Sequence, residues 1–271
     1  MLRKNYNIWI GLGLITFMGS LSLISLFYTP FDPHAMHMDA RFLKPSATFL
    51  LGTDQFGRDI LSRIMAGGRI AFLISLLAVI FGSLVGFLLG SIAGLGKGFI
   101  GQIIMRFIDG LMAFPGILLA LMLVTILGRG QHSVVIAIGV FNIPIFARLV
   151  YGLILGNENK LYLKAAESFG ASKIYILFKH MVPAILPRFM TQFSSSVGVA
   201  ILTESSLSFL GLGVQPPNPS WGIMLSEASQ YIMTNYYLPI VPGLAIMLTV
   251  LGFNLLGDGI NDMLVKRGSE L

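Results

Sequence analysis

Long apolar runs alternate with short polar segments along most of the chain. Six runs reach the length, about 20 residues, at which an α-helix crosses the roughly 30 Å hydrocarbon core of a bilayer. They comprise residues 7–28, 69–95, 103–127, 133–155, 189–212 and 238–257. The alternating segments of about ten residues that membrane strands require are absent. We therefore predict an all-α fold, a polytopic membrane helical bundle with six transmembrane helices.

Composition supports a membrane protein. Of 271 residues, 55% are hydrophobic and 11% charged, with a mean hydropathy of +0.82, which is far from a soluble globular average. The absence of cysteine excludes disulfides and thiolate metal sites. Arg3 and Lys4 before the first run also fit a signal peptide, but the run is too long and lacks a small-x-small cleavage motif. We expect a retained first span.

Basic residues indicate the orientation, because they accumulate on the cytoplasmic side of membrane proteins. With the N-terminus inside, 12 of the 18 basic residues fall on the cytoplasmic side: Arg3, Lys4, Lys97, Arg106, Arg148, Lys160, Lys164, Lys173, Lys179, Arg188, Lys266 and Arg267. The net charge of +6 is thus a topology signal and not a sign of nucleic-acid binding.

The six spans divide the chain into a simple series of segments. We expect a cytoplasmic N-terminus (1–6), a transmembrane domain (7–257) and a cytoplasmic C-terminus (258–271). Within the domain we expect an external segment (29–68), a cytoplasmic loop (156–188) and a second external loop (213–237).

The cytoplasmic loop contains KAAESFGASKIYILFKHMVPAILP, residues 164–187, a polar helical stretch in an apolar chain. Its apolar residues recur every three or four positions, which predicts one helical stripe: Leu163, Ala166, Gly170, Ile174, Leu177 and Met181. Gly170 is suited to ending one short helix and Ser172 to capping a second. Periodicity alone leaves two alternatives open, a helix on the membrane surface or a helix docked in a partner's groove.

Three segments, which follow one another along the chain in the same order as in the family, resemble one family. They are the loop YLKAAESFGASKIYILFKHMVPAILP, LGTDQFGRDILSRIMAGGRIA (51–71) and ESSLSFLGLGVQPPNPSWGIML (204–225). The loop resembles the "EAA" loop of permease subunits of ATP-binding-cassette (ABC) importers. The other two resemble segments of the second, shorter permease in the dipeptide, oligopeptide and nickel subgroup. The three segments are spread over nearly the whole chain.

The resemblance implies a type I ABC importer permease in a bacterial cytoplasmic membrane, with both termini in the cytoplasm. Its implied partners are a second homologous permease, two cytoplasmic ATPases and an extracytoplasmic solute-binding protein, and its cargo is short peptides, nickel or a metal chelate. ATP and Mg would bind the ATPases, and this chain would hold no cofactor. The implied coupling residues are Lys164, Ala165, Ala166, Glu167, Gly170, Ala171, Ser172, Ile174, Leu177 and Pro187. Lys164 stands where the family usually has an acid, and Ala184 where it usually has asparagine.

The residues themselves indicate that the chain is not an enzyme. The nearest match to a phosphate-binding loop has Ser91 in place of its first glycine and Gly98 in place of its hydroxyl. Neither paired carboxylates nor a nucleophile elbow occur. An ion-coupled secondary transporter is the alternative, disfavoured because matching halves with broken helices are missing. A membrane-anchored sensor is disfavoured because no sizeable soluble domain is present.

Several residues within the spans need an explanation. Four glycines at a strict spacing of four predict close helix packing: Gly82, Gly86, Gly90 and Gly94. Phe114 and Pro115 interrupt the third span, and Pro144 interrupts the fourth. Such breaks suit a translocation path that opens and closes. Charges within spans are costly. We expect Asp109 to pair with Arg106 or line the path, and Glu204 to line the path or bond across helices.

The external segments are candidate contact surfaces for a solute-binding protein, through residues 29–68 and 215–231. Within 29–68, after TPFDP, we expect an amphipathic piece that lies on the outer membrane surface before the second span, with ion pairs Asp54–Arg58 and Asp59–Arg63. Aromatic residues near the second loop suit an interfacial belt: Trp221, Tyr231, Tyr236 and Tyr237. His34 and His37 are too few for a metal shell, and we expect no metal site.

Overall fold

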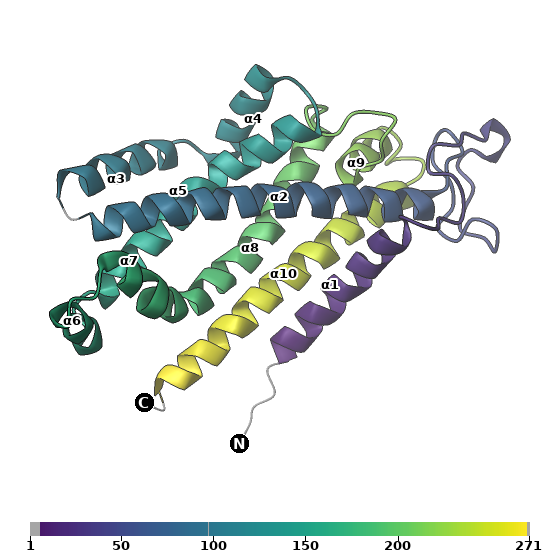
Figure 1. Cartoon of the computed structure of the whole chain (residues 1–271). Coiled ribbons are helices and arrows are strands. Elements are labelled where there is room, and N and C mark those ends of the chain that lie inside the picture. Colours follow the sequence, from purple (N-terminus) through teal and green to yellow (C-terminus); the bar gives the residue numbers. More distant parts are fainter. Residues whose placement is uncertain (1–5, 97, 270–271) are drawn as a thin grey trace.

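The computed structural model of the protein describes residues 6–96 and 98–269, and this part of the chain folds into a helical bundle (Figure 1). The helices are α1 (Tyr6–Ile24), α2 (Ile60–Leu95), α3 (Phe99–Met112), α4 (Gly116–Leu127), α5 (Gln131–Asn157), α6 (Leu161–Ser168), α7 (Lys173–Ile176), α8 (Val182–Phe209), α9 (Trp221–Ser229) and α10 (Tyr237–Ser269). A 3₁₀ turn occupies Met38–Ala40 and a π-helical turn Leu177–Met181. The predicted all-α class is confirmed.

Each predicted span is mostly helical, but not each is a straight crossing. By length and apolar composition, α1, α2, α5 and α10 qualify as spans among the described residues. The third predicted span, 103–127, is wrong as a single helix, because α3 and α4 meet at an angle of 90°. Pro115 precedes α4 and cannot continue the hydrogen bonds of α3. α8 has 28 residues but includes Arg188, Glu204 and several serines, and does not qualify.

The bundle is built around α2, α5, α8 and α10. α2 and α5 pack along much of their length, α8 lies against α10, and α1 packs on α10 at the edge (Figure 1). Branched and aromatic side chains fill the space between them, and the fully buried ones include Ile74, Ile138, Phe146, Ile201 and Trp221. Burying such side chains is the main stabilising contribution to helix packing in the water-exposed parts, and close dispersion contact takes that role in lipid.

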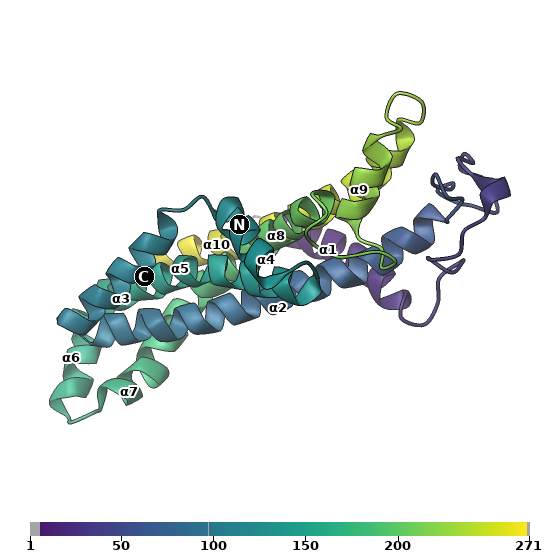
Figure 2. The ribbon, with the colours of Figure 1, turned by 90° about the horizontal axis from the view of Figure 1, so that it is seen from above.

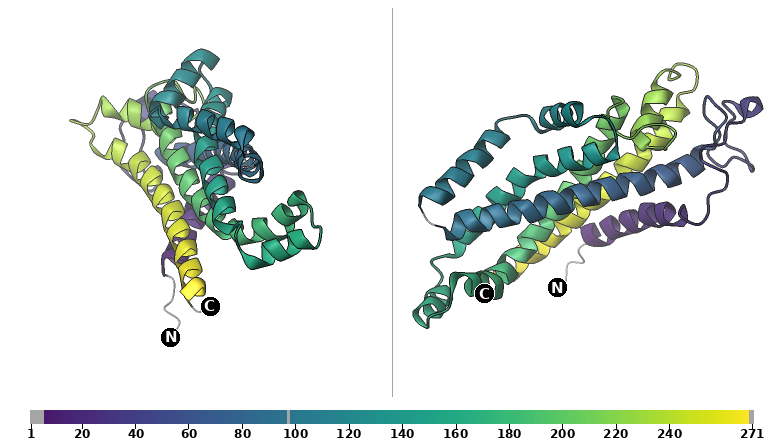
Figure 3. Two further views of the ribbon diagram at one scale, coloured as in Figure 1. Left: turned by 90° about the vertical axis from the view of Figure 1, so that its left-hand side faces the viewer. Right: turned by 45° about the horizontal axis from the view of Figure 1, so that its top comes forward.

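The two ends of the bundle differ. α6 and α7 project from one end (Figure 2), and the start of α1 and the end of α10 point towards that same end (Figure 3). Residues 29–59 and α9 lie at the opposite end (Figure 1). The basic residues predict that the first of these ends faces the cytoplasm, so it is called the inner end and the opposite one the outer end. Three basic residues used for that prediction, Arg3, Lys4 and Lys97, lie outside the described residues, as do the side chains of Lys266 and Arg267.

The outer end of α2 corrects one prediction. The segment expected on the outer membrane surface instead forms the first turns of α2, in line with the span. The Asp59 side chain caps the helix by accepting a hydrogen bond from the Ser62 N–H at 2.8 Å. Ile60 and Ile64 are buried in the main core rather than against lipid. The amphipathic pattern was real, but its apolar face packs on protein.

Candidate functional sites

The coupling segment, defined here as residues 161–181, is two short helices joined by a tight turn. α6 ends just before Gly170, whose φ of +84° is a conformation that glycine adopts without strain. Ser172 then caps α7, its hydroxyl oxygen accepting a hydrogen bond from the Tyr175 N–H at 3.2 Å. The π-helical turn follows and continues into α8. Local sequence therefore sets the break between the helices.

The predicted stripe is divided between the two sides of this segment, because Gly170 and Ile174 are exposed while its other members face the bundle. Leu163, Leu177 and Met181 are buried with Val150 and Ile154 of α5 in a small core of their own. They hold the segment onto the bundle and are not available to a partner. The single stripe was wrong because the chain reverses at Gly170, so the helical period does not carry from α6 into α7.

The outward side carries a different apolar set. Phe169 is 92% exposed, Leu161 85% and Ile174 68%. Tyr162, Tyr175 and Phe178 are also exposed. Of the predicted coupling residues, the exposed ones are Lys164, Ala165, Glu167, Gly170, Ser172 and Ile174; Ala166, Ala171 and Pro187 are half-buried, and Leu177 is buried. Pro187 belongs to α8.

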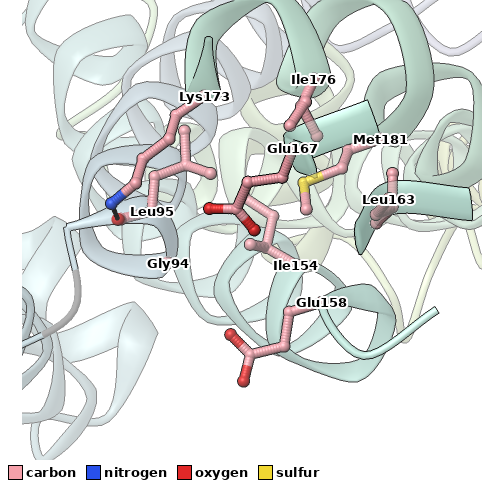
Figure 4. Close-up of a pocket in the computed structure, with 9 residues that line it drawn as sticks. All are labelled: Gly94, Leu95, Ile154, Glu158, Leu163, Glu167, Lys173, Ile176 and Met181. Atoms are coloured by element: carbon pink, nitrogen blue, oxygen red, sulfur yellow. Dashed lines mark hydrogen bonds between the residues drawn. The ribbon is translucent and has the colours of Figure 1, made fainter. Parts of the chain in front are cut away.

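A pocket of about 80 Å³ separates the coupling segment from the inner ends of α2 and α5 (Figure 4). Its lining includes Leu95, Glu158 and Glu167. The Lys173 ammonium donates a hydrogen bond to the Leu95 carbonyl oxygen at 3.3 Å, joining α7 to the end of α2. The segment is thus attached to the bundle both by apolar contact and by a charged donor at a helix C-terminus, where a cation is favoured.

The four spaced glycines of α2 face α5. A Cβ atom on Gly86 would lie 2.7 Å from both the Ile143 carbonyl oxygen and the Phe146 Cβ, and one on Gly90 would lie 2.5 Å from the Ala147 carbonyl oxygen. Gly82 and Gly94 meet α5 in the same way. Contacts this short leave no room for a side chain, so the glycines set the close approach of the two helices.

Asp109 does not pair with Arg106. Its carboxylate accepts a hydrogen bond from the Arg148 guanidinium of α5, forming an ion pair between helices. The two side chains are 52% and 53% exposed, respectively. Phe114 and Pro115 lie nearby in the bend between α3 and α4, and both are exposed. The sequence contained no signal for a partner 39 residues away.

Glu204 is completely buried. One carboxylate oxygen accepts hydrogen bonds from the Ser208 hydroxyl at 2.7 Å and the Ser220 hydroxyl at 3.3 Å, and the other from the Ser205 hydroxyl at 3.3 Å. It therefore joins α8 to the segment before α9. Of the two expected roles, this arrangement corresponds to bonding between elements and not to lining a surface.

Buried charges hold the outer end together. Arg58 pairs with Asp54 and with Glu227 of α9, each at 2.6 Å. Arg63 lies 3.6 Å from the Asp54 carboxylate and 3.5 Å from that of Glu227. The predicted Asp59–Arg63 pair is therefore wrong, since Asp59 caps α2. Glu227 was missed, because only tertiary folding brings α9 to the start of α2.

One further prediction about the outer end, the interfacial position of Trp221, is wrong. Trp221 is not part of an interfacial belt: it is fully buried, and its indole N–H donates to the Ile64 carbonyl oxygen at 3.0 Å. Gly67 and Gly68 of α2 make room for its ring. His34 Nδ1 lies 3.0 Å from the Pro217 carbonyl oxygen, joining the two external segments. The described residues contain no group of three or more side chains suited to a metal.

Comparison with known proteins decides the family. The family model described as binding-protein-dependent transport system inner membrane component matches residues 86–269 of the chain. The chain belongs to this family. It is a permease subunit of an ABC importer, a transport component and not an enzyme.

Named relatives of this permease include two kinds of importer subunit. It is 48% identical over 220 residues to the glutathione transport system permease protein GsiD of Pectobacterium atrosepticum, covering 81% of this chain and 73% of the relative. It is 39% identical over 262 residues to the di/tripeptide transport system permease protein DppC of Pseudomonas aeruginosa, covering 93% and 86%.

A solved structure supports the fold. The permease matches a chain of the MetNI methionine ABC transporter, solved in inward-facing conformations, with a TM-score of 0.58 and 18% sequence identity. The match covers 71% of this permease and 91% of that chain. The predicted type I importer architecture is confirmed at the level of fold.

Proposed function

We propose that this permease forms the path for short peptides in an ATP-driven importer of the bacterial cytoplasmic membrane. The glutathione and di/tripeptide permeases named above support this cargo class. The proposed partners are a second homologous permease, two cytoplasmic ATPases and an extracytoplasmic solute-binding protein. ATP and Mg would bind the ATPases. Both termini and the coupling segment would face the cytoplasm, in keeping with the distribution of basic residues.

The exposed apolar side of the coupling segment carries the proposal. Phe169, Leu161 and Ile174 stand out from the end of the bundle on short helices that carry several charged residues. Such a projection, apolar at its tip, suits a groove on a water-soluble partner. The opposite side is packed into the bundle through Leu163 and Leu177. Movement of a docked ATPase would therefore be passed directly to α5 and α8.

A pair of substitutions at Gly170 tests docking. A Cβ atom at this position would meet no atom within 4 Å, so even arginine fits the isolated chain, and Gly170→Ala and Gly170→Arg share the cost of a positive φ. Arginine alone adds bulk and charge to the docking surface. We expect Gly170→Arg to abolish ATP-driven uptake at a normal membrane level, and Gly170→Ala to retain part of it. Normal uptake by Gly170→Arg would refute docking at this surface.

The cargo needs a separate test. A strain lacking the transporter, complemented with it or with an empty vector, is supplied with labelled dipeptide, longer peptides, glutathione and nickel, free or chelated. We expect transporter-dependent uptake of one or more peptides. Uptake of nickel or its chelate without any peptide would overturn the proposed cargo while leaving the importer class intact.

A further inference from the structure

The Asp109–Arg148 ion pair lies at membrane depth. Asp109 is ten residues from the start of α3 at the inner end, and Arg148 nine from the inner end of α5, which places both about 14 to 15 Å along their helices. α5 has 27 residues and is about 40 Å long, so when it is centred in the roughly 30 Å hydrocarbon core it extends about 5 Å beyond each side, and Arg148 lies about 8 to 9 Å inside the boundary with Asp109 paired to it. Charges at such depth face a cavity or another protein rather than lipid, because exposure to hydrocarbon is costly.

The neighbouring backbone indicates the same surroundings independently. Residues 113–115 between α3 and α4 are not helical, and all three are exposed. They follow the 14 residues of α3, about 20 Å from its start. Irregular backbone at membrane depth is found only where it is buried in protein or lines a water-filled cavity. The ion pair and the bend thus mark one patch that faces either a water-filled cavity or another protein and not lipid, comprising Asp109, residues 113–115 and Arg148.

The pair also has unused bonding capacity. One guanidinium nitrogen of Arg148 bonds to one oxygen of Asp109, and no other hydrogen bond joins either side chain to the described residues. Arginine binds carboxylates in a two-pronged geometry, and an aspartate accepts several hydrogen bonds. A short peptide carries an ammonium group at one end and a carboxylate at the other, which complements the two groups.

We propose that Asp109 and Arg148 face the translocation path and contact the charged ends of a passing peptide, Arg148 the carboxylate and Asp109 the ammonium. This inference rests on the proposed peptide cargo. It assigns a role to Arg148, which the sequence placed only among the cytoplasmic basic residues. The two groups already neutralise each other. When a peptide with both termini charged replaces the contact between them, no charge is left isolated.

Accessibility to water is tested first. The chain has no cysteine, so single cysteines can be introduced at Phe114 in the patch and at Phe17 on α1, two positions of similar exposure in the structure. α1 lies at the edge of the bundle away from α3 and α4 (Figure 3). The assembled transporter in nanodiscs is treated with a charged methanethiosulfonate, and labelling of this subunit is measured by mass spectrometry. We expect Phe114→Cys to react and Phe17→Cys to resist. A Phe114→Cys that resists labelling overturns the inference.

Peptide transport is tested second. We expect Asp109→Asn and Arg148→Gln each to lower the maximal uptake rate about tenfold or more, the effect of losing one hydrogen bond to a charged group. Arg106→Gln, one turn from Asp109, is the matched control and should stay near the wild-type rate. The exchange Asp109→Arg with Arg148→Asp should not restore uptake, because each group would then face the wrong end of the peptide.

The outcomes separate the two proposals. Restored uptake in the exchange variant would show that the pair only clamps α3 to α5 and would overturn this inference. Wild-type uptake in both single variants would do the same. A wild-type transporter that imports no peptide in the same assay would overturn the proposed cargo instead.

Discussion

The two ends of the bundle differ in whether their side chains find partners within the chain. At the outer end, Asp54, Arg58, Arg63 and Glu227 pair with one another and are largely buried. At the inner end, the coupling segment leaves large apolar side chains exposed, Phe169 above all. The charges of the outer end are therefore paired within the chain, whereas the exposed apolar side of the coupling segment has the character of half an interface. Substitutions at the outer end should reduce stability, and those on the exposed inner surface should reduce transport.

Asp54→Ala should have the largest effect on stability. The substitution removes the partner of Arg58 and a carboxylate oxygen that accepts from the Phe56 and Arg58 N–H groups. Breaking one side of a buried ion pair costs about 3–5 kcal/mol. We expect a large fall in the unfolding temperature of the detergent-purified protein. Asp39→Ala, an exposed acid in the same external segment, is the control and should unfold like the wild type.

Leu177→Ala and Phe169→Ala should separate the two sides of the coupling segment. Leu177 is buried, so its truncation should cost about 2–5 kcal/mol of stability. Phe169 is exposed, and its truncation should change stability by no more than about 0.5 kcal/mol. Thermal unfolding and ATP-driven uptake are measured for both. A Phe169→Ala variant with wild-type uptake would contradict the assignment of this surface to docking.

Gly86→Val should loosen the packing of α2 on α5. The new side chain meets backbone and Phe146, which cannot move away freely, and such overpacking costs about 1–3 kcal/mol. The unfolding temperature in detergent should fall. Gly152→Val on α5 is the matched control, because a Cβ atom there meets nothing within 4 Å. Equal effects of the two substitutions would argue against the glycine contact as the cause.

Lys164→Glu should have the smallest effect. Lys164 is exposed, so stability should stay within about 0.5 kcal/mol of the wild type. If the partner ATPase presents an acid to this lysine, reversing the charge weakens coupling by an amount typical of an exposed pair, about 1 kcal/mol or less. ATPase activity of the assembled transporter at low and high salt measures this. A defect that persists at high salt would rule out simple charge repulsion.

Features within a few turns of chain could be predicted from the sequence. The break at Gly170 and the cap at Ser172 appeared where expected, because both depend on the conformations open to those residues. The Asp54–Arg58 pair is likewise local. Predictions failed where a second element decided the outcome. Trp221 has the composition of a belt residue, and its burial depends on the small residues of α2 opposite it.

The sequence by itself determined that this chain is a helical membrane protein and which stretches form its long apolar helices. Those properties depend on the length of the apolar runs and on where charged residues interrupt them. Only the tertiary structure decided which side of the coupling segment is buried, that Asp109 meets Arg148, and that Glu227 joins Arg58. These contacts unite residues far apart in the chain, and periodicity carries no information across the turns that bring them together.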